Sequence, residues 1–120
     1  MSEATELGSV HAERTILGAI LLENSAFYEA GQELRIDELY VDSHRRIYAC
    51  ISRLINRGSA ADITTVPEEL RATRELDTVG GRGYILDVTE GIPRNYSISS
   101  YVRLVKETAS LREMAPLVTI

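Results

Sequence analysis

Apolar residues recur along much of the chain at intervals of three and four, the spacing that places side chains on one face of an α-helix. The first run predicts a helix over about residues 10–22, with Ser9 as its N-cap. Asn24 or Ser25 is then expected to cap a second, short helix. We expect the apolar faces of several helices to build one core, whose predicted members are Ile16, Leu17, Ile20, Ile47, Ile51, Leu54 and Leu70.

Start and stop signals divide the middle of the chain. A third helix is expected to begin at Asp42 or Ser43 and to end at Gly58, because glycine favours the position that follows a helix. Residues 65–68, Thr-Val-Pro-Glu, are typical of a capping box with a proline in the first turn. They predict a short helix that ends near Arg74.

Glycine and proline punctuate the last third of the chain. A glycine pair at 80–81 precedes a predicted helix over about 84–89, and residues 91–93, Gly-Ile-Pro, end it. Ser97 is expected to cap a last helix. No alternating run of β-branched residues reaches the length of a strand. The pattern therefore predicts an all-α fold, a compact bundle of about six helices.

The domain organisation follows from the same pattern. We expect a loose tail over residues 1–9 and a globular helical head over 10–94. Residues 115–120 are mostly apolar, whereas free termini are usually polar, so the chain looks cut from a longer protein.

The charge of the chain disfavours a domain built mainly to hold nucleic acid. Its net charge is -5, and the acidic excess falls in residues 1–42. The basic exception is the segment with Arg45, Arg46, Arg53 and Arg57. Arginines spaced in this way are more typical of a solvated helix face than of a helix that reads DNA.

Composition also indicates the compartment. The most apolar stretch, residues 17–22, is far shorter than the ~20 residues that a membrane span requires. Cys50 is the only cysteine, so no intramolecular disulfide can form, and we expect it to be an inert core residue. A cytoplasmic protein without membrane contact is the expectation.

Chemistry-bearing motifs are missing from the sequence. Lys106 is the only lysine and no glycine loop precedes it, so no P-loop is predicted. Gly81 and Gly83 do not continue into a dinucleotide-binding fingerprint. His11, expected to be exposed, and His44, expected at a helix start with its ring hydrogen-bonded, lack metal-ligand spacing. We expect no catalytic, cofactor-binding or metal site within these residues.

Short motifs follow one another along residues 10–112. They are Ala12–Leu21, Leu39-Tyr40 with His44–Tyr48, Asp62–Val66 with Glu69-Leu70, Leu76–Gly81, Ile92-Pro93, and Tyr101 with Val105–Glu107. In this order and spacing they resemble the N-terminal domain of DnaB-type bacterial replicative DNA helicases. Within the motifs, the residues that we expect to maintain the fold are Leu17, Gly18, Tyr40, His44, Ile47, Thr65, Glu68, Gly80, Gly81 and Pro93.

The sequence departs from the family pattern near its end. Ser97, Ser100, Glu113 and Met114 replace more usual residues, and Pro116 is expected to interrupt the last helix. The resemblance makes residues 95–120 the start of a helical hairpin, truncated here, and places a RecA-like motor with ATP and magnesium downstream of this chain.

The resemblance also implies partners. Domains of this family pair, build a collar over the helicase hexamer and dock the bacterial primase, and a helicase loader is a further candidate. Direct DNA binding by this domain is expected to be slight. The contact residues proposed for the last helix are Tyr101, Leu104, Val105, Leu111 and Arg112. Two alternatives remain open from the residues alone: a helical adaptor or loader-like protein without a motor, and a small helical DNA-binding domain.

Overall fold

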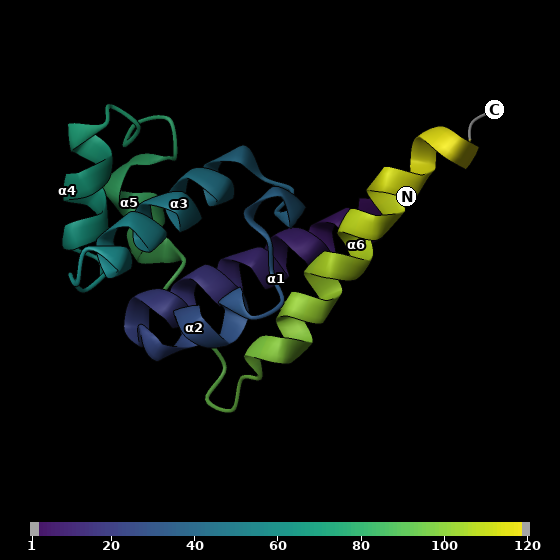
Figure 1. Ribbon diagram of the computed structural model, residues 1–120, viewed down its shortest axis with the longest axis horizontal. Coiled ribbons are helices and arrows are strands. Elements are labelled where there is room, and N and C mark those ends of the chain that lie inside the picture. The colour runs from purple at the N-terminus through teal and green to yellow at the C-terminus, as the bar shows by residue number, and fades with distance from the viewer. Residues whose placement is uncertain (1–2, 119–120) are drawn as a thin grey trace.

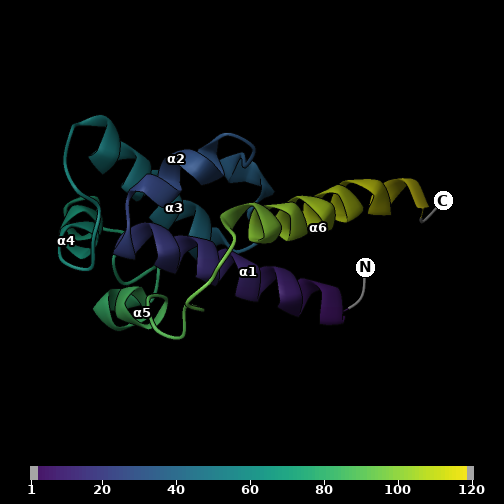
Figure 2. The same cartoon turned by 90° about the horizontal axis from the view of Figure 1, so that it is seen from below.

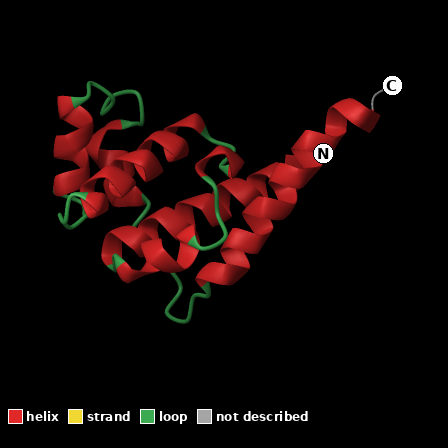
Figure 3. Ribbon diagram, viewed as in Figure 1, coloured by secondary structure: helices red, strands yellow, loops and turns green. Residues whose placement is uncertain are grey.

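The computed structural model describes the backbone of residues 3–118 and the side chains of residues 8–114, and that part of the chain is helical without a strand (Figure 3). The elements are α1 (Glu3–Leu22), α2 (Ser25–Gly31), a short 3-10 helix η1 (Ile36–Glu38), α3 (Asp42–Asn56), α4 (Thr65–Ala72), α5 (Gly81–Asp87) and α6 (Ile98–Val118). The predicted all-α bundle of about six helices is confirmed.

The first and last helices pair along the length of the molecule. α1 and α6 contact each other and run in opposite directions (Figure 1). A second view shows that the N-terminal end of α1 and the C-terminal end of α6 lie at the same end of the molecule (Figure 2). The shorter helices α2 to α5 gather at the other end and form the head. Both long helices therefore extend outward from the head.

One core holds the head together. All seven residues predicted for it are at most 4% exposed, which confirms the predicted apolar faces. Side chains from α1, α3, α4, α5 and α6 meet in this cluster. Burial of a large aliphatic side chain contributes about 1.5–3 kcal/mol, so this cluster is the main source of stability.

α1 begins earlier than the sequence predicts. It starts at Glu3 rather than near residue 10, so Ser9 lies inside the helix and is not its N-cap. Ser9 is fully buried. Its hydroxyl donates a hydrogen bond to the carboxylate of Glu13, one turn later, at a distance of 3.5 Å. The loose tail expected over residues 1–9 is accordingly helical from Glu3 onward. Residues 1–2 lie outside the described residues.

Two predicted helix caps have other roles. The Asn24 side chain makes no cap to α2 but joins two distant segments: its amide donates to the carbonyl oxygens of Ile20 and Ala61, and its Oδ1 accepts the Ala61 N–H. At α4 the predicted Thr65–Glu68 box is wrong. These differences show that polar side chains near helix starts were identified correctly, but their partners were not.

The capping box of α4 lies three residues earlier, between Asp62 and Thr65. Asp62 Oδ1 accepts the backbone N–H of Thr65 at 2.8 Å, and Thr65 Oγ1 accepts the backbone N–H of Asp62 at 2.9 Å. Glu68 instead pairs with Arg71 and Arg82. This reciprocal pair satisfies two backbone donors at once, which is the physical basis of a capping box.

Residues with positive φ lie at the next three helix boundaries. α3 ends as predicted before Gly58, which has φ +82. α4 ends at Ala72, two residues before the predicted Arg74, and Arg74 has φ +64. α5 begins at Gly81, earlier than predicted, because left-handed Gly80 at φ +110 turns the chain directly into the helix.

The last helix starts as predicted and continues further than predicted. Ser97 Oγ accepts the backbone N–H of Ser100 at 3.4 Å, as expected of its cap. α6 then runs through Pro116 to Val118, so the interruption expected at Pro116 is wrong. A proline removes one hydrogen bond of the helix, and the turns on either side can remain helical.

Candidate functional site

A buried polar cluster links α1, α3 and α5. Glu13 on α1 and His44 on α3 are both fully buried, with Glu13 Oε1 2.7 Å from His44 Nδ1. The other ring nitrogen, Nε2, lies 2.5 Å from the hydroxyl of Tyr84 on α5. The prediction that His44 sits at a helix start with a hydrogen-bonded ring is confirmed. Its partners Glu13 and Tyr84 were not predicted from the sequence.

The arrangement of this cluster resembles that of a hydrolase triad, in which a carboxylate orients a histidine toward a hydroxyl. Burial is the first cause that raises the pKa of the Tyr84 hydroxyl, so this group stays protonated. A protonated phenol that faces the core is not an activated nucleophile. The cluster therefore holds helices together, and the geometry assigns it no reaction.

The lone thiol is equally unsuited to covalent chemistry. Cys50 is fully buried, its Sγ lies 3.7 Å from the Val66 carbonyl oxygen, and burial raises its pKa to about 11. The reactive form of cysteine is the thiolate, which is scarce at such a pKa. Among the described residues no group of three His, Cys, Asp or Glu side chains is placed to hold a metal.

The arginines of α3 bind the acidic side chains of α4 and its end. Arg57 lies 2.8 Å and Arg53 3.4 Å from Glu69, and Arg46 lies 3.0 Å from Glu75. These contacts hold α4 against α3, while the three arginine side chains remain 40%, 41% and 55% exposed for Arg46, Arg53 and Arg57, as expected for a solvated helix face. The same pairing leaves them poorly disposed to neutralise nucleic-acid phosphates.

Arg45 serves the turn that precedes α3. Its guanidinium donates to the carbonyl oxygens of Leu39 and Tyr40 at 2.6 and 3.0 Å. The guanidinium of Arg45 therefore stabilises the turn before α3 through these hydrogen bonds.

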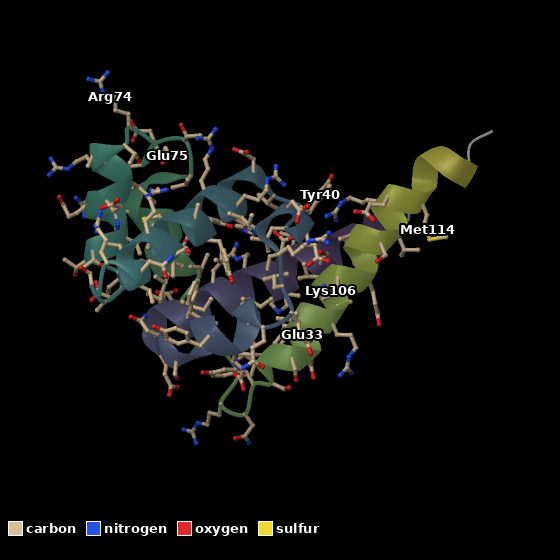
Figure 4. All side chains as sticks on the ribbon, viewed as in Figure 1. Glu33, Tyr40, Arg74, Glu75, Lys106 and Met114 are labelled. Atoms are coloured by element: carbon tan, nitrogen blue, oxygen red, sulfur yellow. The ribbon has the colours of Figure 1, made fainter. Side chains whose placement is uncertain are left out.

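Polar contacts with η1 and the residues next to it hold α6 in place. Lys106 Nζ lies 3.0 Å from both carboxylate oxygens of Glu38 and donates to the Glu33 carbonyl oxygen at 2.8 Å (Figure 4). Arg112 donates to the Glu38 carbonyl oxygen at 2.9 Å, and its guanidinium lies 4.9 Å from the centre of the Tyr40 ring. The only lysine of the chain thus has a structural role.

The five contact residues proposed on α6 fall into two groups. Val105 is fully buried and belongs to the core, and Arg112 donates a hydrogen bond to η1, so both make contacts within the chain. Tyr101 is half-buried and packs against the core. Leu104 and Leu111 remain, 38% and 47% exposed and seven residues apart. Met114 adds a further exposed apolar side chain at the outer part of the helix (Figure 4).

The residues expected to maintain the fold are found in several settings. Leu17, Gly18, His44 and Ile47 are buried, whereas Tyr40, Glu68 and Pro93 are exposed. Gly80 and Gly81 both have positive φ, at +110 and +76. No helix in the described part of the chain combines the length and the apolar character needed to cross a membrane.

Comparison with known proteins identifies the family. The family model described as the DnaB-like helicase N terminal domain matches residues 5–107. The replicative DNA helicase DnaB of Treponema pallidum is 33% identical over 93% of this chain, and the replicative DNA helicase DnaC of Bacillus subtilis is 37% identical over 88% of it. The chain spans 26% and 23% of the length of these two relatives.

The fold agrees with a solved structure. The crystal structure of the N-terminal domain of DnaB helicase from Mycobacterium tuberculosis matches with a TM-score of 0.86 and 31% identity, covering 92% of this chain and 80% of that chain. Sequence and fold thus lead to one assignment: the chain belongs to the family of DnaB-like helicase N-terminal domains.

Proposed function

We propose that this domain serves as the collar and docking module of a replicative DNA helicase. In this role it pairs with further copies of itself in a hexamer and receives the bacterial primase. The motor that hydrolyses ATP with magnesium and unwinds DNA belongs to the remaining three quarters of such a protein. The relatives, of which the chain spans about a quarter, support this division.

The observation that carries the proposal is the outer face of α6. Leu104 and Leu111 lie on one side of a helix that extends beyond the head (Figure 1), while its opposite side is buried through Val102 and Val105. A helix with apolar residues on two sides can complete its own core and still offer a surface to another protein. A specific interface must bury about 1,000 Å² or more, which two leucines alone do not supply. We therefore expect further residues of the helicase to complete this surface.

Calorimetry against the helicase-binding domain of the cognate primase tests the proposal. Leu104→Asp and Leu111→Asp should each weaken binding at least tenfold in a chain that remains folded by circular dichroism. Leu86→Asp is the matched control, because Leu86 is 46% exposed on α5, which lies in the head, and should bind as the wild type does.

The other outcomes contradict the proposal. If binding survives both α6 substitutions, the docking surface lies elsewhere. If both substitutions unfold the chain, Leu104 and Leu111 act as core residues. Sedimentation equilibrium of the same variants measures whether self-association depends on the same face.

A further inference from the structure

A groove lined by aromatic side chains lies between α2 and α3. The centre of the Phe27 ring lies 5.6 Å from that of Tyr28 and 5.6 Å from that of Tyr48, so the three rings form a continuous row. The other residues that line this aromatic groove are Gly31, Gln32, Leu34 and Asn56. Its volume of about 410 Å³ is in the range typical of binding pockets in proteins.

The row of rings is open at one end. Tyr28 is 62% exposed, whereas Tyr48 is only 7% exposed and belongs to the core. Aromatic ring faces carry partial negative charge and attract cations, and the planar guanidinium of arginine stacks on them best. The exposed end of the row therefore suits a cationic side chain.

Polar atoms in the aromatic groove can serve as hydrogen-bond acceptors. The Tyr48 hydroxyl lies 3.8 Å from the position that a Cβ on Gly31 would take, so it faces the groove, and it makes no hydrogen bond with another described residue. The amide nitrogen of Asn56 donates to Ser52 Oγ at 3.3 Å, which leaves its side-chain oxygen as an acceptor. A ligand side chain with several N–H groups would satisfy these oxygens.

The α2 side of the groove is acidic. Residues 23–34 contain Glu23, Glu29 and Glu33 and no basic residue, which gives this segment a charge of -3. All three side chains belong to exposed residues. Glu29 and Glu33 are one helical turn apart, and each directly follows a residue that lines the groove. They form an acidic rim along α2.

The basic side chains next to the groove already have acidic partners within the chain. These ion pairs are Arg57 with Glu69, Arg35 with Asp37, Arg45 with Asp42, and Lys106 with Glu38. Each of these positive charges is offset by its partner, so the acidic rim keeps a negative potential. A negative rim attracts a basic ligand and repels an acidic one.

We infer that the aromatic groove docks a basic segment of a partner protein, with an arginine side chain of that segment lying against the rings of Phe27 and Tyr28. The guanidinium stacks on the rings, and its N–H groups bond the Tyr48 hydroxyl and the Asn56 side-chain oxygen. The acidic rim attracts the remaining positive charge of the segment. The groove shares no residue with the outer face of α6, so this inference does not depend on the proposed function.

NMR titration of the whole chain tests the inference. The probe is the peptide acetyl-Gly-Leu-Arg-Leu-Arg-Gly-amide, which should shift the backbone amide resonances of Tyr28, Gly31, Gln32 and Asn56. A matched peptide with citrulline in place of arginine keeps the shape and removes the charge, and should bind at least about fivefold more weakly at low ionic strength. Equal affinity of the two peptides, shifts confined to other residues, or no shifts at all would overturn the inference.

Other occupants of the groove give different results in the same spectra. Tighter binding of a peptide with glutamate in place of arginine, or of a neutral proline-rich peptide, contradicts a basic ligand. Shifts of the groove resonances that depend on protein concentration without peptide would assign the groove to a second copy of the chain, which also contradicts the inference.

Gly31→Leu tests the groove from the protein side, because it fills the groove without a change of charge. A Cβ at this position meets only the Tyr48 hydroxyl, at an ordinary contact distance, so the variant should remain folded by circular dichroism and bind the arginine peptide about tenfold more weakly. Gly83→Leu is the matched control, since a Cβ there meets no atom within 4 Å, and it should bind as the wild type does. Unchanged binding by a folded Gly31→Leu would contradict docking in the groove.

Removal of the acidic rim tests the charge. The double variant Glu29→Gln with Glu33→Gln should bind the arginine peptide about threefold or more weakly at low ionic strength, and added salt should reduce the difference. Asp87→Asn with Glu90→Gln is the matched control, because it removes two exposed acids that do not line the groove. Equal losses in the two double variants would mean that only net charge matters and would contradict a specific rim.

Discussion

Gly18 of α1 faces the main-chain carbonyl oxygen of Val88 so closely that a Cβ at position 18 would lie 1.9 Å from that oxygen. Ile92 would be the next obstacle, at 2.7 Å. Val88, the C-cap residue that follows α5, therefore packs directly on the backbone of α1, which only glycine permits.

We predict that Gly18→Ala lowers the free energy of unfolding by about 3 kcal/mol, because the carbonyl group cannot move as freely as a side chain. Urea unfolding followed by circular dichroism measures the loss. Gly83→Ala is the control: a Cβ there meets no atom within 4 Å, and the substitution should stabilise α5 by about 0.5–1 kcal/mol. Equal effects at the two glycines would mean that the close approach is absent.

The second prediction concerns the Asp62–Thr65 capping box. Asp62→Ala should lower the free energy of unfolding by about 1 kcal/mol. Thr65→Ala should cost a similar amount, and the double variant should cost less than the two together, because each side chain serves the other. Additive losses would show that the two residues act separately.

This box also predicts a dependence on pH. The backbone N–H groups of Thr65 and Thr64 hold the pKa of Asp62 below its usual value. The contribution of Asp62 is therefore present above its unfolded-state pKa and is lost as pH falls through the lower, folded-state pKa. Wild type and Asp62→Asn, measured from neutral to acid pH, should converge in stability at the acid end. A constant difference would contradict the assignment.

A third prediction uses the left-handed backbone of Arg74. A side chain at φ +64 costs about 1 kcal/mol, and glycine avoids that cost. Arg74→Gly should thus raise the free energy of unfolding by about that amount. Arg74→Ala removes the same charge but keeps a Cβ, so it should give no comparable gain. Equal gains from both variants would attribute the effect to charge.

The fourth prediction concerns the thiol. Because burial raises the pKa of Cys50 to about 11, iodoacetamide at pH 8 should modify the folded chain only at the rate at which it opens. Urea at a concentration that unfolds the chain should make alkylation rapid, and mass spectrometry follows both. Rapid modification of the folded chain would place the thiol at the surface.

Local patterns predicted more of the fold than of the polar contacts. The seven core residues followed from helical periodicity, because burial of one face is a property of each helix by itself. Glu13 contacts backbone groups 27 and 28 positions away, and His44 contacts Tyr84 40 positions away. No spacing rule connects residues so far apart, although an acid within the apolar run of α1 was a visible signal.

Two differences between the sequence pattern and the structure have similarly specific causes. Residues 62–65 and 65–68 both fit the pattern of a capping box, and only the path of the preceding chain decides between them. On α6, periodicity showed apolar residues on two sides, but the side that α1 covers depends on tertiary packing. Val105 lies on the covered side and Leu104 does not.

The pairing of α1 with α6 affects how the chain acquires its structure during synthesis. The ribosome makes α1 first, but the helix that covers much of it is the last described element to appear. The ribosome adds about 5–20 residues per second, so the apolar side of α1 stays uncovered by α6 for seconds after α1 has been made. Contacts between such distant parts of a chain also slow folding. A nascent chain stalled before residue 98 should consequently expose apolar surface that chaperones bind.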